Sequence, residues 1–271
     1  MNANKALWEK GDFTRIAASM RESGAALIAA IGVKPGETVL DLGCGDGTTA
    51  VPAARLGADV LGVDIASNLV AAGNRRASDE GLSNLRFQEG DASDLTGIED
   101  AHFDLVISIF GAMFAPRPED VAREMVRVTR KGGRIVMGNW IPGDPTLVAQ
   151  VLKISSAYTP PPPPGFVSPM LWGKDEEVVA RFTSAGIAPD AITCVRDQYS
   201  FRYAGPPARL LDDFVQYYGP TMNAVEAAER EGRGDRLKQE LAALFEQQNE
   251  SGRDDVTAIS ATFLRVTVRV D

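Results

Sequence analysis

The chain is poor in the residues that build disulfide frameworks, zinc sites and histidine-based catalytic centres. Its 271 residues include two cysteines, Cys44 and Cys194, which lie far apart, and a single histidine, His102. Two distant cysteines make no disulfide framework, and with one histidine they make no Cys/His zinc cluster. The sequence therefore predicts no metal centre, and it excludes most versions of a histidine base or triad.

The chain also lacks a surplus of positive charge and a long apolar run. Its formal net charge is −9 at pH 7, with 28 Lys and Arg against 37 Asp and Glu. Because a nucleic-acid partner needs a basic surface, a small molecule is the better candidate partner. No stretch approaches the roughly 18 apolar residues of a membrane span, and residues 1–10 do not have the form of a secretory signal. We predict a cytoplasmic protein with no membrane partner, present as a monomer or a homodimer.

Short apolar runs alternate with helical patterns along the first half of the chain. We expect strands at 38–42, 59–63, 85–89, 103–109 and 134–140, and helices at 2–31, 49–56, 68–80 and 119–129. This alternation indicates a parallel sheet covered on both faces. With two later strands, at 191–202 and 256–270, we predict an α/β fold: a doubly wound, mostly parallel seven-stranded sheet.

The regular alternation of predicted strands and helices ends after Trp140. Helical stretches at 147–157, 175–185, 207–231 and 233–248 predict a helical cap inserted late in the chain. A run of prolines at 160–164 has two interpretations, a stiff polyproline spacer or a ligand for a proline-binding module, and we favour the spacer.

A glycine-rich loop follows the first strand. Its glycines are Gly43, Gly45 and Gly47, and Thr48 stands where a dinucleotide-binding Gly-x-Gly-x-x-Gly loop needs its third glycine. Glycines at this place let the backbone turn sharply and approach a ligand closely. The loop begins with an acid, Asp41, which would repel a pyrophosphate but suits an ammonium group. The spacing therefore favours a ligand other than a dinucleotide.

Together with acids after the second and third strands, this loop resembles that of the class I S-adenosylmethionine-dependent methyltransferases. The resemblance runs in order from about residue 36 to 140 and includes the strand at 103–109 and the turn at 130–133. It implies S-adenosylmethionine as cofactor, S-adenosylhomocysteine as product and a Rossmann-like methyltransferase fold. It also implies that 1–140 is a cofactor-binding core with an N-terminal helical segment. Residues 141–255 would be a cap and substrate region carrying one strand, and 256–271 the strand that returns to the sheet.

The resemblance also assigns cofactor-binding residues. The loop residues Asp41, Gly43, Cys44 and Gly45 would hold the methionine part, and Asp64 the ribose hydroxyls. The remaining assignments are Ile65 against the adenine, Asp91 beside the adenine amino group, Ala92 and Ile109 at the ends of their strands, and Trp8 and Thr14 over the cofactor.

The methyl acceptor should lie beyond the carboxyl ends of the strands, where open α/β sheets bind ligands. This rule selects the segments after the fourth and fifth strands, which lack the Asn/Asp-Pro-Pro-aromatic motif of DNA-adenine methyltransferases. Taken together, residues 110–114, residues 139–140, the proline run and residues 171–173 resemble a bacterial group related to quinone-biosynthesis methyltransferases. We predict a substrate pocket of Phe110, Met113, Asn139, Trp140 and Trp172.

The predicted reaction is methyl transfer to a small molecule by in-line displacement, mainly through proximity and desolvation. The sequence identifies no catalytic residue: His102 precedes the fourth strand, at the amino end of the sheet. Two alternatives stay open, a nicotinamide-dependent oxidoreductase and a non-catalytic S-adenosylmethionine-binding protein.

Overall fold

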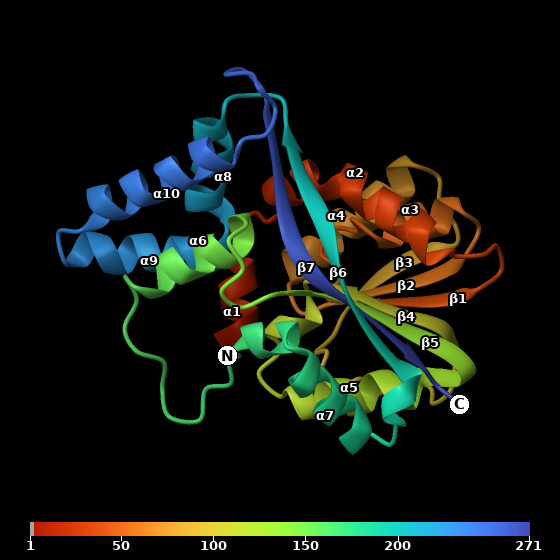
Figure 1. The fold of residues 1–271 in the computed structure, drawn as a ribbon. Helices are drawn as coiled ribbons and strands as arrows, with labels where there is room; N and C mark the ends of the chain where they lie inside the picture. The colour runs from red at the N-terminus through yellow and green to blue at the C-terminus, as the bar shows by residue number, and fades with distance from the viewer. Residues whose placement is uncertain (1–2) are drawn as a thin grey trace.

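A mixed sheet of seven strands organises the computed structural model, which describes residues 3–271 (Figure 1). The strand order is β3-β2-β1-β4-β5-β7-β6. Strands β1 to β5 run parallel, whereas β7 runs antiparallel to both β5 and β6. The predicted α/β fold is therefore confirmed. The strands are β1 Thr38–Leu42, β2 Asp59–Asp64, β3 Leu85–Glu89, β4 Phe103–Ile109, β5 Thr129–Trp140, β6 Ile192–Tyr203 and β7 Thr257–Arg269.

Helices cover both faces of the sheet (Figure 1). One face carries α2 (Thr14–Ile31), α3 (Ala50–Arg55) and α4 (Ser67–Asp79), and the other α5 (Pro118–Val128) and α7 (Asp175–Ser184). Neighbouring residues of β1 point to opposite faces: Val39 belongs to the apolar cluster that includes Ile28, and Leu40 to the one that includes Met125. Both faces are therefore dry, which explains why the central strands are continuous apolar runs.

Four helices form a bundle beside the sheet, namely α6 (Leu147–Ser156), α8 (Pro207–Tyr217), α9 (Gly219–Arg230) and α10 (Gly234–Gln248) (Figure 1). They all lie within residues 141–255, the segment that we predicted to form the cap. In the same segment, α7 covers the sheet and β6 forms its edge strand. The division of the chain into core, cap and returning strand stays a prediction.

Two predicted helices are each broken in two. The helix predicted at 2–31, whose first residue lies outside the described residues, is α1 (Ala3–Glu9) followed by α2. Between them, Asp12 accepts hydrogen bonds from the backbone N–H and the hydroxyl of Thr14 and so starts α2 afresh. The helix predicted at 207–231 divides into α8 and α9 at Tyr218, because Pro220 cannot donate a helical hydrogen bond and belongs at a helix start.

Short 3-10 turns complete the secondary structure, at η1 (Ala112–Phe114), η2 (Pro169–Gly173) and η3 (Pro189–Ala191). No helix within residues 3–271 is long and apolar enough to cross a membrane. Helix α1 lies between the cap bundle and the carboxyl edge of the parallel strands (Figure 1). This edge is where an open α/β sheet binds its ligands.

Candidate functional site

The glycine loop turns sharply after β1. Gly43, Gly45 and Gly47 all have positive φ angles, of 70°, 56° and 91°, a region that side chains other than glycine rarely adopt. Gly43 also lies so close to the next loop that a Cβ atom there would come within 2.7 Å of the Cα atom of Gly111. The loop is tied to β2 because the N–H of Gly43 donates to the carbonyl of Val63 at 2.7 Å. These constraints fix the backbone at the carboxyl edge.

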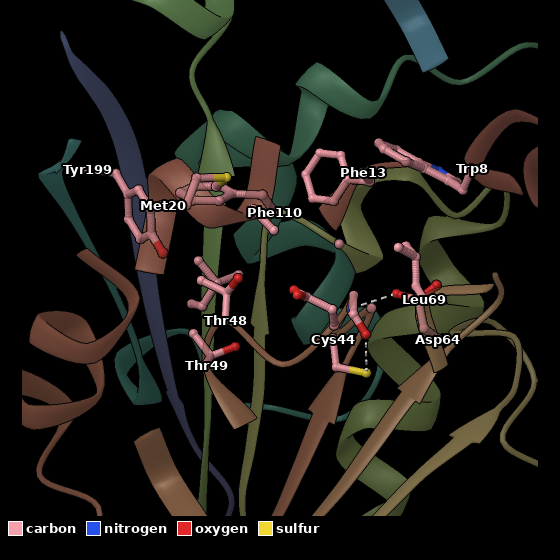
Figure 2. Close-up of a pocket in the computed structure, with 16 residues that line it drawn as sticks. Trp8, Phe13, Met20, Cys44, Thr48, Thr49, Asp64, Leu69, Phe110 and Tyr199 are labelled. Carbon is pink, nitrogen blue, oxygen red and sulfur yellow. Dashed lines mark hydrogen bonds between the residues drawn. The ribbon is translucent and has the colours of Figure 1, made fainter. Parts of the chain in front are cut away.

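A cavity of about 680 Å³ opens above this loop (Figure 2). Figure 2 shows Trp8, Phe13 and Phe110 on the side of the cavity opposite Cys44 and Asp64. The structure brings seven predicted site residues to this cavity: Trp8, Gly43, Cys44, Gly45, Asp64, Ile109 and Phe110. Burial raises the pKa of the Cys44 thiol well above its usual range, so Cys44 is a loop residue and no nucleophile.

Asp64 connects the glycine loop to the start of α4. One carboxylate oxygen accepts the N–H of Gly45 at 2.8 Å (Figure 2). The other accepts the N–H of Ala66 at 2.9 Å. The side chain is only 8% exposed, and burial raises its pKa. Asp64 therefore serves both as a helix-start residue and as a carboxylate on the wall of the cavity.

Asp41 lies beneath the cavity and does not line it. One of its oxygens accepts the hydroxyl of Thr49 at 2.6 Å, while Oδ1 has no hydrogen-bond partner among the described residues. Burial, together with the nearby charge of Asp64, raises the pKa of Asp41 to about 7. An unpartnered buried carboxylate oxygen is costly, and a cation placed nearby would offset that cost.

Asp46 is a cavity residue that the sequence analysis missed. It is almost fully buried and forms ion pairs with Arg21 at 3.0 Å and Arg76 at 3.5 Å. Arg76 also donates to the backbone carbonyl of Asp46 at 2.6 Å. These arginines come from α2 and α4, so only the tertiary fold reveals that the acid within the glycine loop is neutralised.

Besides Asp41, four predicted cofactor residues do not line the cavity. Asp91 uses Oδ1 to accept the N–H and the hydroxyl of Ser93, at 2.9 and 2.7 Å, which closes the turn after β3. Ala92 packs against the apolar core, Ile65 is half-buried, and the hydroxyl of Thr14 is bound to Asp12. Their contacts with the cofactor stay predictions.

Helix α1 is held across the cavity by polar contacts at both ends. Lys5 pairs with Glu89 at the end of β3, and Glu9 accepts the hydroxyl of Ser67 at 2.6 Å. On the cap side, Lys10 pairs with Glu226 of α9 at 2.8 Å. These contacts, which no sequence pattern indicates, keep the Trp8 ring over the glycine loop.

A second cavity, of about 340 Å³, adjoins the first and is lined by apolar and aromatic side chains. Phe110 lines both cavities and has a positive φ of 65°, which is rare for a bulky residue. Its ring stacks on Trp140, with 3.7 Å between the ring centroids. Strain of this kind is found where a backbone is held in place for function.

Of the five predicted substrate-pocket residues, Phe110 and Trp140 line this second cavity, and Met113, Asn139 and Trp172 do not. Successive strand residues face opposite ways, so Asn139 points away from the side that Trp140 faces. Trp172 is buried beside Phe182, with its ring beneath the guanidinium of Arg181. The lining of this cavity does not support these three residues, and their contact with the acceptor stays a prediction.

Comparison with known proteins identifies the family. A family model described as a methyltransferase domain matches residues 40–137. The chain is 34% identical over 254 residues to the uncharacterized protein Rv1405c of Mycobacterium tuberculosis, and the match covers 89% of this chain and 88% of that protein. A demethylmenaquinone methyltransferase of Beutenbergia cavernae is 40% identical over 115 residues, which cover 42% of this chain and 45% of that enzyme.

Solved structures share the fold. The YcgJ protein of Bacillus subtilis matches with a TM-score of 0.59 at 18% identity, covering 92% of this chain and 99% of that one. Phosphoethanolamine N-methyltransferase 2 of Haemonchus contortus matches with a TM-score of 0.63 at 16% identity, covering 100% of this chain and 61% of that one. The chain belongs to the class I S-adenosylmethionine-dependent methyltransferases, which confirms the resemblance seen in the sequence.

Proposed function

We propose that the protein transfers a methyl group from S-adenosylmethionine to a small-molecule acceptor. The observation that carries this proposal is the pair of adjoining cavities that share Phe110. The first contains the glycine loop and two carboxylates, and the second is almost wholly apolar. Such a pair provides a polar site for the cofactor and a dry site for the acceptor.

The residues of the first cavity fit this cofactor. The glycine loop leaves room for a ligand to approach the backbone, and the Asp64 carboxylate suits a pair of hydroxyl groups. The unpartnered oxygen of Asp41 suits a nearby cationic group. When bound, S-adenosylmethionine would supply a methyl group attached to a sulfonium sulfur. Loss of that methyl group turns the sulfonium into a neutral thioether, which is a good leaving group.

The protein contributes alignment and exclusion of water. Trp8 covers both cavities, and the stacked rings of Phe110 and Trp140 give the boundary between them a fixed shape. Among the described residues that line the two cavities there is no His, Lys or Arg, and the two carboxylates, Asp46 and Asp64, are engaged in ion pairs and backbone hydrogen bonds. Burial raises the pKa of Tyr199 and of Tyr218, so both stay protonated at neutral pH and neither is available as a base. Proximity and desolvation therefore account for the reaction.

Two experiments test the proposal. Calorimetric titration should show micromolar binding of S-adenosylhomocysteine and none of NADH; the reverse would restore the nicotinamide-dependent alternative. Transfer of labelled methyl from the cofactor to acceptors from a broad panel should then be detected. Tight cofactor binding without transfer to any acceptor would favour the non-catalytic alternative.

A further inference from the structure

The second cavity, here called the acceptor chamber, is lined by residues from several separate parts of the chain. Phe110 and Trp140 come from the ends of β4 and β5, Val148 and Phe214 from cap helices α6 and α8, and Trp8 from α1. The chamber therefore lies between the sheet, the cap helices and α1.

The lining carries no formal charge. None of the described residues that line the chamber is Asp, Glu, Lys, Arg or His. Its polar groups are the hydroxyl of Tyr218 and two indole N–H groups, of which that of Trp8 already donates to Asn4 at 3.2 Å. Removing an ion from water into such surroundings costs several kcal/mol unless it is paired. A charged ligand would find no partner here.

Aromatic walls can also attract cations, but neighbouring rings cover part of the ring faces in this chamber. Phe110 and Trp140 stack with an interplanar angle of 10°. Trp8 meets Phe13 at 87° and Phe114 at 73°, so in each pair the edge of one ring lies against the face of the other. A cation needs an open ring face, whereas a flat neutral ring can slide against edges and faces alike. The packing favours a neutral aromatic ligand.

We infer that the acceptor chamber takes an uncharged, planar aromatic acceptor whose methylated atom carries its own lone pair, such as a heteroaromatic nitrogen. This inference rests on the proposed function and adds the class of the acceptor. The acceptor's lone pair forms the new bond to the methyl carbon while the carbon–sulfur bond breaks and its electron pair stays on sulfur. The positive charge then resides on the methylated acceptor.

An acceptor of this kind is consistent with a site that offers no free general base. Alcohols and ordinary phenols must lose a proton to become good nucleophiles, and the tyrosines at the cavities have pKa values raised by burial. A neutral nucleophile needs no such help. Because the transition state spreads the charge of the sulfonium over two groups, apolar surroundings favour it. The cationic product fits the uncharged chamber poorly, which promotes its release.

Three probes of nearly one shape test the charge preference at pH 8: neutral isoquinoline, anionic 2-naphthoate and cationic N-methylisoquinolinium. Each is titrated calorimetrically into protein loaded with S-adenosylhomocysteine. We expect isoquinoline to bind at least tenfold more tightly than either ion. Binding of either ion as tightly as isoquinoline would overturn the inference. With S-adenosylmethionine, mass spectrometry should detect isoquinoline methylated at nitrogen; methylation of 2-naphthoate in its place would also overturn it.

A filling variant tests the location. Val148→Phe adds a ring inside the chamber and should weaken isoquinoline binding at least tenfold while S-adenosylhomocysteine binding changes less than twofold. Val195→Phe, the same substitution at an exposed position of β6, should change neither. If Val148→Phe does not fold, Phe114→Trp narrows the chamber instead. Undiminished isoquinoline binding in a folded filling variant refutes the location. Failure of the wild type to bind S-adenosylhomocysteine refutes the proposed function itself.

Discussion

Replacing Asp41 by asparagine should stabilise the fold and weaken cofactor binding in the same variant. The pKa of this carboxyl rises from 3.8 to about 7 in the folded protein. A rise of about three pH units corresponds to about 4 kcal/mol of cost to the folded state above pH 7. The asparagine side chain keeps an oxygen that can accept the Thr49 hydroxyl and carries no charge, so the variant escapes this cost.

The direction of the pH effect follows from the ionisation of Asp41 in the unfolded and in the folded protein. Between about pH 4 and pH 7 the unfolded chain has lost the Asp41 proton and the folded protein has kept it, so rising pH favours unfolding through this group. The free energy of unfolding of Asp41→Asn should therefore exceed that of the wild type, and the gap should widen by about 2–3 kcal/mol from pH 5 to pH 8. Urea denaturation of both proteins at the two pH values measures it.

A matched control comes from the same loop. Asp46→Asn removes the ion pairs with Arg21 and Arg76 and should lower the free energy of unfolding. Cofactor binding gives the second readout, because a bound cation favours ionised Asp41. Calorimetry should find wild-type affinity for S-adenosylhomocysteine rising several-fold from pH 6 to pH 8, and little rise in Asp41→Asn. A stability gap that stays constant with pH would refute the reasoning.

Three further predictions concern the cofactor cavity. Asp64→Ala should weaken S-adenosylmethionine binding by about 1.5–3 kcal/mol, the range for a charge-assisted hydrogen bond, and unchanged affinity in calorimetry would remove Asp64 from the ribose role. Gly43→Ala should cost about 1–3 kcal/mol of stability in urea denaturation, and more than Gly36→Ala. Gly36 also has a positive φ, but an added Cβ there meets open space, so equal losses would contradict the close contact at Gly111. Glu9→Ala breaks the bond to Ser67 and should speed S-adenosylhomocysteine dissociation several-fold in stopped-flow measurements, with an unchanged rate arguing against α1 as a cover.

The fold could be predicted from local sequence patterns. The strands β1, β2 and β4 contain short apolar runs, and the spacing of Gly43, Gly45 and Gly47 argues against a dinucleotide loop without reference to any other part of the chain. The break between α1 and α2 was also encoded locally, by Gly11 and Asp12, but the apolar periodicity on both sides obscured it. Sequence reasoning works where the cause lies within a few residues.

The residues of the substrate pocket were harder to predict, because contacts between segments far apart in the sequence determine them. Asn139 and Trp140 are neighbours, and the alternation of a strand sends only one of them to the acceptor chamber. Trp172 was predicted for the substrate pocket, yet its ring is buried against Phe182 of α7. Which aromatic ring reaches the chamber depends on packing between segments far apart in the sequence.

The position of Trp8 has a kinetic consequence. Because Trp8 of α1 lines both cavities, we expect release of α1 to open the way for cofactor and acceptor alike. Lys5 and Lys10 hold this helix by partly exposed ion pairs, which salt screens. Turnover limited by product departure should therefore quicken with ionic strength, even though neither ligand cavity depends on those lysines.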